Sequence, residues 1–235
     1  MKNILLFGAG KSAYSLIKYF LEHLETENWH LTIADMNPQF VNNLFQHNRL
    51  NVVEFDLSKE DLQKKLINKA DIVISMLPAT FHVQIAKTCL AYAKNVITPS
   101  YVSEEMKALN TEAKNKGLIF LNEMGLDPGI DHMSAKYLID KIKEQGGIIE
   151  GFESFTGGLI APESDNNPWH YKFTWNPRNV VLAGQGGAVK FLHNGKYKYI
   201  PYHKLFDRTE IIHIDEYGDF EGYANRDSLK YIDLY

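Results

Sequence analysis

The first half of the chain alternates short apolar runs with longer stretches of mixed apolar and polar residues. Short apolar runs are typical of parallel strands that are buried on both faces, whereas the longer stretches repeat apolar residues at helical spacing. In residues 11–24, for example, Leu16, Phe20 and Leu24 share one helix face. The predicted strands are residues 4–7, 30–35, 51–55, 71–75, 95–98 and 118–121.

Five helices are predicted between these strands, at residues 11–24, after Pro38, and at 58–68, 82–93 and 104–116. Ser58 starts a capping-box pattern, Ser103 is a predicted N-cap, and Gly117 ends the last helix. Six strands that alternate with five helices predict an α/β fold with a Rossmann-type, doubly wound parallel sheet.

A connector at residues 122–132 leads into a helix predicted at 131–145 with Asp131 as its N-cap. Beyond it the pattern changes to short β runs, which predict a second, mainly antiparallel α+β domain for substrate binding and dimerisation. We expect a dinucleotide-binding domain at 1–130 and this second domain at 131–235. The predicted β runs are 148–156, 171–175, 179–182, 187–192, 197–201 and 210–214, with a tight turn at 193–196.

The first strand runs directly into Gly8-Ala9-Gly10-Lys11-Ser12-Ala13, a G-x-G-x-x-G/A pattern. Gly8 permits a tight turn, Gly10 allows the backbone to approach a pyrophosphate, and Ala13 allows close packing of helix on strand. The N–H groups that open the helix, at Lys11 and Ser12, would then face the phosphates. The strand before the motif and the helix after it favour a dinucleotide site over an ordinary glycine turn.

Asp35 ends the second predicted strand, 22 residues after Ala13, where such folds place the carboxylate that binds the adenosine ribose. The alternative is that Asp35 caps the helix after Pro38. A carboxylate here repels a 2′-phosphate, and neither Met36 nor Asn37 supplies a compensating cation. The cofactor is therefore expected to be NAD(P), with a preference for NAD.

Further residues follow the strands at the same edge of the sheet, which is where open α/β sheets bind their ligands. Asp56 and Leu57 are candidates for the adenine end, with a plain loop role as the alternative for Asp56. Leu77 and Pro78 turn over the expected cofactor ribose. His82, by contrast, is expected to be exposed at a helix start without a chemical role. The residues on this edge are Gly8, Asp35, Asp56, Leu77, Ser100 and Asn122.

Composition and charge narrow the class of protein. The chain has 235 residues, a net charge of −4 and no long apolar run, so neither nucleic acid nor a membrane is an expected partner. Its one cysteine, Cys89, excludes an internal disulfide and fits a reducing cytoplasm, and it is expected to be a small buried residue. No metal is expected.

Several motifs resemble the L-glutamate-forming saccharopine dehydrogenases, also called saccharopine reductases. They are Gly8-Ala9-Gly10, Thr98-Pro99-Ser100-Tyr101, residues 125–132 (GLDPGIDH), 157–163 (GGLIAPE), Asn167-Pro168, 171–175 (YKFTW) and 223–228 (YANRDS). The resemblance covers nearly the whole chain. Carboxynorspermidine dehydrogenase shares the Asp-Pro-Gly element and remains an alternative. The chain departs from the family at Thr156, where fungal members carry Cys, and at Ala224, where the family has Pro.

The resemblance implies oxidation of L-saccharopine to L-glutamate and 2-aminoadipate 6-semialdehyde, or the reverse reduction. It places Ser100, Tyr101, Asp127 and Arg226 at the substrate and Trp175 along the cofactor. We expect Asp127 and Tyr101 to be the catalytic pair that handles the proton of the substrate amine.

Three points about the second half stay open in the sequence. Arg178 either pairs with an acid of the chain or binds a substrate carboxylate. The aromatic residues at 169, 171, 173 and 175 alternate at strand spacing and are expected to form one packed face. The apolar end at Tyr235 suggests a fragment of a longer protein.

The alternatives to an enzyme are an NAD(H)-binding sensor or a partner subunit without turnover. The oligomeric state is left open, with a homodimer as one candidate.

Overall fold

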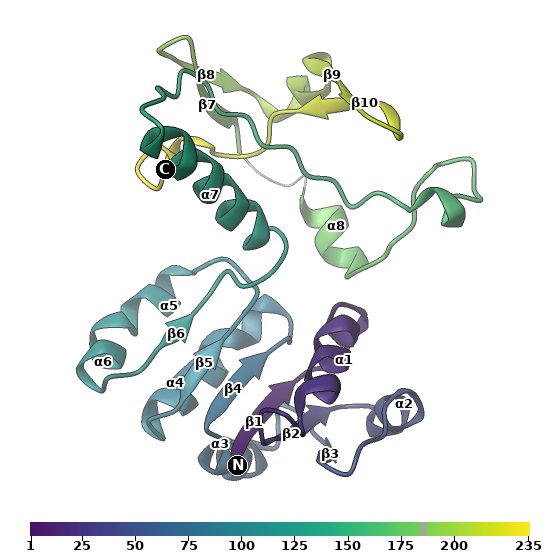
Figure 1. Ribbon diagram of the computed structural model, residues 1–235, viewed down its shortest axis with the longest axis vertical. Coiled ribbons are helices and arrows are strands. Elements are labelled where there is room, and N and C mark those ends of the chain that lie inside the picture. Colours follow the sequence, from purple (N-terminus) through teal and green to yellow (C-terminus); the bar gives the residue numbers. More distant parts are fainter. Residues whose placement is uncertain (184–186) are drawn as a thin grey trace. The chain divides into compact units, whose positions relative to one another are not determined.

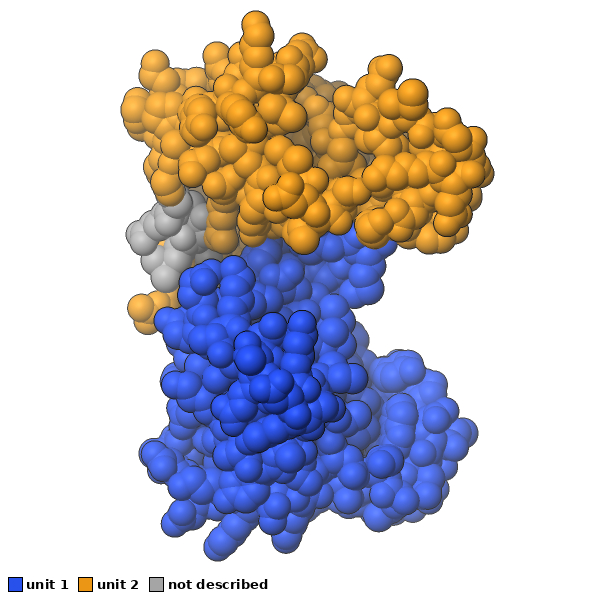
Figure 2. Space-filling view, turned by 90° about the vertical axis from the view of Figure 1, so that its left-hand side faces the viewer, with its two compact units in different colours: residues 1–134 blue, residues 135–235 orange. Residues whose placement is uncertain are grey.

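The computed structural model describes residues 1–183 and 187–235 (Figure 1). These residues fall into two compact units, 1–134 and 135–235, which Figure 2 colours separately.

Unit 1 is built on a six-stranded parallel sheet in the order β3-β2-β1-β4-β5-β6. The first strand lies in the middle, where Ile4 is in register with Leu31 on one side and Ile72 on the other. This order confirms the predicted doubly wound sheet. The chain adds strands outward from β1 on one side as far as β3 and then on the other side from β4 to β6, so the switch point lies between β1 and β4. The strands are β1 (Lys2–Phe7), β2 (Trp29–Asp35), β3 (Leu50–Glu54), β4 (Ile72–Ser75), β5 (Asn95–Ile97) and β6 (Phe120–Leu121).

Helices connect the strands in the predicted places (Figure 1). Three of the connections are divided: 3-10 turns precede α1 (at Lys11–Ala13) and α4 (at Ala79–Phe81), and two short helices stand in place of the last predicted one. Ser103 is the N-cap of α5, as predicted, and its Oγ accepts a hydrogen bond from the Met106 N–H at 3.2 Å. The helices are α1 (Tyr14–His23), α2 (Pro38–Leu44), α3 (Glu60–Lys69), α4 (His82–Ala91), α5 (Glu104–Ala108) and α6 (Asn110–Asn115).

Alternate residues of β1 serve two separate hydrophobic cores. Ile4 and Leu6 pack on the side of the sheet that α1 covers, together with Ile17 of that helix. Leu5 and Phe7 pack on the opposite side, against the buried faces of α3, α4 and α5. Because β1 is buried on both faces, its apolar run fixes the sheet between two helical layers.

Two helix starts differ from the sequence prediction. Ser58 is not an N-cap: α3 begins at Glu60, and the Ser58 N–H instead donates to Asp56 Oδ1 at 2.7 Å in a turn. Asp131 lies inside the first turn of α7 (Ile130–Glu144), and its Oδ1 accepts the Gly129 N–H at 2.7 Å. In both places a short polar side chain binds a loop N–H, which competes with the capping role.

Unit 2 holds two antiparallel pairs, β7 (Val189–His193) with β8 (Lys196–Ile200), and β9 (Thr209–Ile214) with β10 (Gly218–Tyr223). The predicted turn joins the first pair, with positive φ at both Asn194 and Gly195 as type I′ hairpin turns require. Val189, Ile200 and Leu205 form a small buried cluster.

Three β predictions in unit 2 are wrong. Residues 148–156 and 171–175 contain no strand, and no described strand pairs with them. Consequently the alternating aromatic residues do not form one strand face, and Trp169 is 85% exposed. Residues 179–182 belong instead to helix α8 (Pro177–Ala183), which starts at an Asn-Pro pair: Asn176 Oδ1 accepts the Arg178 N–H at 3.0 Å. Apolar β-branched residues form a strand only when a neighbour supplies hydrogen-bond partners.

Candidate active site

The glycine loop after β1 has the shape that a pyrophosphate needs. Gly8 has φ +87°, and a Cβ there would lie 3.0 Å from the Met76 carbonyl oxygen, so the loop packs directly against the end of β4. A Cβ on Gly10 would meet nothing within 4 Å, which leaves that side open to a ligand. Ala13 is 1% exposed in the core, as its close-packing role predicts.

Lys11 and Ser12 begin the 3-10 turn that follows Gly10 and are both exposed. No side chain of the described residues caps this turn, so its first N–H groups can bind an anion. The loop residues therefore fit a dinucleotide.

Asp35, at the end of β2, is joined to the glycine loop. Its Oδ2 accepts the Ala9 N–H at 2.7 Å and its Oδ1 accepts the Asn37 N–H at 2.8 Å. Asn37, not Asp35, caps α2, since Asn37 Oδ1 accepts the Phe40 N–H at 3.0 Å; the capping alternative for Asp35 is therefore wrong. Each carboxylate oxygen retains acceptor capacity, which is what binding the hydroxyls of a ribose requires.

The other candidate cofactor residues also follow their strands. Asp56 comes after β3, and the hydrogen bonds from Ser58 lower the pKa of its carboxyl group. Leu57 and Leu77 pack partly against the core on the α3 and α4 side of the sheet, and Pro78 follows Leu77. The structure thus places these residues on the carboxyl edge of one parallel sheet, where the sequence predicted them.

Tyr101 and Asp127 are brought together at the same edge. The Tyr101 hydroxyl donates a hydrogen bond to Asp127 Oδ1 at 2.7 Å. Both side chains are exposed, so a substrate can reach them. The two residues are 26 positions apart in sequence, and no local element connects them.

A closed loop at residues 125–129 presents Asp127. The Gly125 N–H donates to the Pro128 carbonyl at 2.9 Å, and the Ile130 N–H donates to the Gly125 carbonyl at 3.0 Å. Gly129 has φ +154°, and a Cβ on it would overlap the Gly125 carbonyl oxygen. A Cβ on Gly125 would lie 3.1 Å from the Pro99 carbonyl oxygen, so the loop lies against the segment that carries Tyr101. The two glycines therefore make the Tyr101–Asp127 contact sterically feasible.

The loops after β5 and β6 are tied to each other by backbone hydrogen bonds. The Glu123 N–H donates to the Ser100 carbonyl at 3.1 Å and the Met124 N–H to the Thr98 carbonyl at 3.0 Å. Glu123 Oε1 accepts the Val102 N–H at 3.1 Å. These bonds tie together the two loops that carry Ser100, Tyr101 and Asp127.

His82 differs from its predicted role, because it is buried rather than exposed. It is 3% exposed, and burial lowers the pKa of its imidazole to about 4. Its Nδ1 lies 2.9 Å from Ser75 Oγ and its Nε2 lies 2.9 Å from Ser100 Oγ. It therefore links the end of β4 to a predicted substrate residue after β5.

A signal in the sequence could have revealed this position. His82, Ile85, Ala86 and Cys89 follow the i, i+3, i+4, i+7 spacing of one buried helix face, and all four are buried. A polar residue on such a face needs hydrogen-bond partners, which here are two serines.

Three candidate residues belong to unit 2 and stay predictions for the site. Arg178 is exposed, and its backbone N–H donates to Asn176 Oδ1 at 3.0 Å. Trp175 is 42% exposed, and its Nε1 would lie 3.8 Å from a Cβ on Gly158. Arg226 is exposed, and its carbonyl oxygen accepts the Lys190 N–H at 2.8 Å, which ties this segment to β7.

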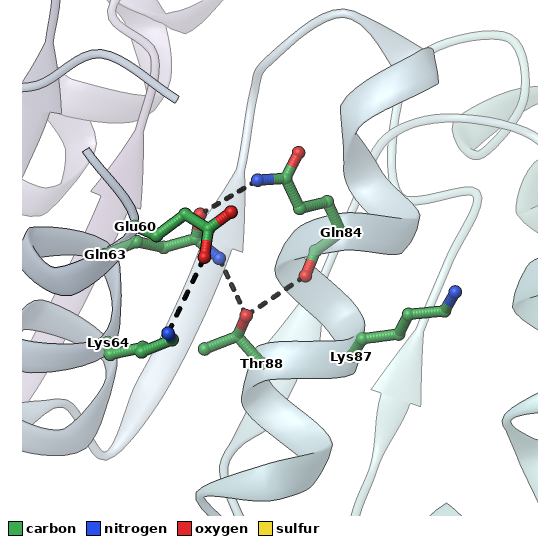
Figure 3. A pocket seen from close by; sticks show the side chains of 6 residues that line it. All are labelled: Glu60, Gln63, Lys64, Gln84, Lys87 and Thr88. Carbon is green, nitrogen blue, oxygen red and sulfur yellow. Dashed lines mark hydrogen bonds and ion pairs between the residues drawn. The ribbon is translucent and has the colours of Figure 1, made fainter. Parts of the chain in front are cut away.

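A groove away from this edge lies between α3 and α4. Figure 3 shows the Gln63 side chain there, bonded to both the Gln84 amide and Thr88. The Gln63 amide donates to Thr88 Oγ1 at 2.8 Å, and the Gln84 amide reaches Gln63 Oε1 at 3.4 Å. All the lining residues come from these two helices rather than from the ends of strands. Because its polar groups bind one another, we assign this groove to helix packing.

The described residues contain no cluster of His, Cys, Asp or Glu that could hold a metal ion. Among the same residues, no helix has both the length and the apolar character needed to cross a bilayer.

Comparison with known proteins agrees with this geometry. Residues 4–121 match the family model "Saccharopine dehydrogenase NADP binding domain", and residues 125–235 match "Saccharopine dehydrogenase C-terminal domain". The chain is 35% identical over 239 residues to the saccharopine dehydrogenase [NADP(+), L-glutamate-forming] of Schizosaccharomyces pombe, covering 100% of the chain and 52% of that protein. It is also 35% identical over 236 residues to the mitochondrial alpha-aminoadipic semialdehyde synthase of Bos taurus, covering 25% of that protein.

A solved structure shows the same fold. The apo saccharopine dehydrogenase (L-Glu forming) of Saccharomyces cerevisiae superposes with a TM-score of 0.88 at 32% identity, covering 100% of this chain and 52% of that one. The chain thus spans about half the length of its fungal relatives. The comparisons support a nicotinamide dinucleotide as cofactor, and the names they carry favour NADP rather than the NAD expected from Asp35. From these matches and the site geometry, the chain belongs to the saccharopine dehydrogenase family.

Proposed function

We propose that the protein containing this chain oxidises saccharopine with NAD(P), giving L-glutamate and 2-aminoadipate 6-semialdehyde, or runs the reverse reduction. The observation that carries the proposal is the Tyr101–Asp127 hydrogen bond at the carboxyl edge of a dinucleotide-binding sheet. The names of the fungal and mammalian relatives, which include both products, support the same substrate.

The chemistry of the substrate explains why this pair is needed. Saccharopine is a secondary amine, and oxidation of the carbon next to nitrogen requires that the amine first be neutral. The resulting imine must then take up water to release the two products. Both steps move protons, so a positioned acceptor and donor accelerate them. A bound nicotinamide dinucleotide supplies the oxidation itself.

We assign the proton-handling steps to Asp127 and Tyr101. Asp127 Oδ1 accepts the Tyr101 hydroxyl, which leaves Oδ2 to accept a hydrogen bond from the substrate amine. Tyr101 holds the carboxylate in one orientation and passes protons between it and water.

Binding residues follow from the charge of the substrate, which carries three carboxylates. Arg226 and Arg178 are assigned to carboxylates because a guanidinium binds them bidentately. Ser100, on the same loop as Tyr101, is assigned to a third contact with the substrate.

For the choice of dinucleotide we propose NAD(H) in preference to NADP(H). The support is local: the Asp35 carboxylate is bonded to the glycine loop at Ala9, where a 2′-phosphate would meet its negative charge. Met36, the next residue, is exposed and carries no charge that could neutralise a phosphate. The names of the matched family model and fungal relatives point the other way, so this preference is a specific claim about the present chain.

Product analysis tests the proposal. The complete gene product is incubated with either saccharopine or carboxynorspermidine and with either NAD⁺ or NADP⁺, and reduced dinucleotide is quantified, together with L-glutamate for saccharopine. We expect both to appear in equal amounts. Tight binding of dinucleotide with neither product would instead identify a binding module, and turnover of carboxynorspermidine alone would identify the related dehydrogenase.

A further inference from the structure

Buried hydrogen bonding links two serines on neighbouring strand ends through His82. Ser75 ends β4 and is fully buried, whereas Ser100 follows β5 and is partly exposed. His82 Nδ1 lies 2.9 Å from Ser75 Oγ and Nε2 lies 2.9 Å from Ser100 Oγ. Among the residues that the structure describes, His82 is the one side-chain partner of each hydroxyl.

The imidazole is neutral at physiological pH, so one ring nitrogen donates a hydrogen bond and the other accepts one. Two arrangements are then available. In the first, Nδ1–H donates to Ser75 and Nε2 accepts the Ser100 hydroxyl. In the second, the Ser75 hydroxyl donates to Nδ1 and Nε2–H donates to Ser100.

Burial of Ser75 selects the second arrangement. If Ser75 accepted from Nδ1–H, its own hydroxyl hydrogen would be buried without an acceptor among the described residues. Unsatisfied buried donors are rarer and more costly than under-used acceptor lone pairs. Ser75 therefore donates to Nδ1, and the ring proton is at Nε2.

This order of bonds determines what Ser100 can do. Because Ser100 Oγ accepts from Nε2–H, its own hydroxyl hydrogen remains to be donated elsewhere. Ser100 lies at the carboxyl edge of the sheet, on the loop that carries Tyr101. A group that takes this hydrogen must be an acceptor, and a carboxylate forms the stronger, charge-assisted bond.

We propose that His82 is a positioning residue that holds Ser100 as a hydrogen-bond donor to a carboxylate of the substrate. This inference rests on the proposed function for the identity of the substrate, but the order of hydrogen bonds does not. His82 thus determines that Ser100 donates, rather than accepts, the hydrogen bond to the substrate. His82 itself does not touch the reacting atoms.

The first test is the tautomer of His82 in the complete gene product without ligand. Long-range ¹H–¹⁵N spectra distinguish a protonated ring nitrogen from an unprotonated one, and His82→Gln identifies the signals. We expect the proton at Nε2; a proton at Nδ1 would overturn the proposal. The tautomer is read from the unmodified protein and does not require turnover of saccharopine; if His82→Gln fails to fold, backbone-to-side-chain assignment of the unmodified protein identifies the signals instead.

The second test compares variants in steady-state kinetics. His82→Asn retains a group that can reach Ser75 but none that reaches Ser100, and Ser100→Ala removes the donor itself. Each should raise KM for saccharopine about tenfold or more, the scale of one hydrogen bond to a charged group, with the Kd for dinucleotide unchanged. The double variant should resemble either single variant, because both remove the same contact.

Controls separate positioning from stability. Cys89→Ala alters another buried residue of α4, and should lower thermal stability while leaving KM unchanged. His82→Gln, whose amide can reach Ser100, should recover part of the lost affinity. The positioning role would be refuted if the increases in KM for saccharopine multiplied in the double variant. It would also be refuted if the variants raised the Kd for dinucleotide and left that KM unchanged. If the unmodified protein does not oxidise saccharopine, the proposed function fails, while the tautomer still decides the hydrogen-bond order.

Discussion

The Tyr101 hydroxyl lies 2.7 Å from Asp127 Oδ1, although the two residues stand on loops that follow different strands. The contact depends on the loop at 125–129 packing against Pro99. Removing the hydroxyl with Tyr101→Phe leaves the Asp127 carboxylate without its fixed partner. We expect kcat to fall by about tenfold or more while dinucleotide affinity stays the same, because a proton relay contributes to the chemical step. An unchanged kcat together with an unmoved pH–rate profile would show that Tyr101 serves packing only.

Gly129 should tolerate no side chain. In Gly129→Ala the new Cβ would overlap the Gly125 carbonyl oxygen, so the loop that presents Asp127 must open. We expect loss of at least about 2 kcal/mol in the free energy of unfolding, measured by urea denaturation, together with a lower kcat. Gly117→Ala is a matched control: it also has positive φ, at +67°, but a Cβ there meets nothing within 4 Å. Equal effects of the two substitutions would contradict the steric account.

Asp35 should set the choice of dinucleotide. Fluorescence titration is expected to show tighter binding of NADH than of NADPH, since the carboxylate next to the glycine loop repels a 2′-phosphate. Asp35→Ser should reduce this preference by removing the charge. Equal or tighter binding of NADPH by the unmodified protein would contradict the proposed preference and agree with the names of the fungal relatives.

His82 should make unfolding sensitive to acid. Its pKa is about 4 in the folded protein against 6.5 for the free side chain, because burial disfavours the charged form. Between these two values the unfolded chain binds the extra proton, so stability is full above pH 6.5 and declines as the pH falls towards 4. The contribution amounts to about 3 kcal/mol at most. In His82→Phe, stability curves measured across this window should be flatter than in the unmodified protein; parallel curves would show that the imidazole titrates normally.

Arg226 should bind a substrate carboxylate. Arg226→Met is expected to raise KM for saccharopine without changing dinucleotide affinity. Arg226→Lys should restore it only in part, because an ammonium lacks the planar fork of the guanidinium. Initial-rate kinetics over a range of saccharopine concentrations measure both effects. If KM is the same in all three proteins, the assignment is wrong.

The sheet of unit 1 could be predicted from the sequence because each strand is a short apolar run bounded by turn residues. The glycine spacing after β1 and the acid at the end of β2 were also expected at one edge of the sheet, and in the structure Asp35 is bonded to the glycine loop there. Local signals sufficed here, since parallel strands buried on both faces need no alternating pattern.

Other features could not be predicted because they depend on contacts distant in sequence. The helical spacing around His82 could have indicated its burial, but not that Ser75 and Ser100, from two other strand ends, lie beside its ring nitrogens. The Tyr101–Asp127 pair was expected from family resemblance, whereas the hydrogen bond between its members required the folded loops. In unit 2, residues 171–175 have strand composition but no described strand as a partner, and composition alone does not supply one.

The central claim is that saccharopine is oxidised at the edge where Asp127 lies. The most direct measurement is the initial rate at which reduced dinucleotide forms from saccharopine, for the complete gene product and for its Asp127→Ala variant at equal dinucleotide saturation. The account predicts turnover by the unmodified protein and a kcat lower by about 10²-fold or more in the variant, the usual scale of acid–base participation. Equal kcat values, with Asp127→Ala affecting thermal stability alone, would contradict it.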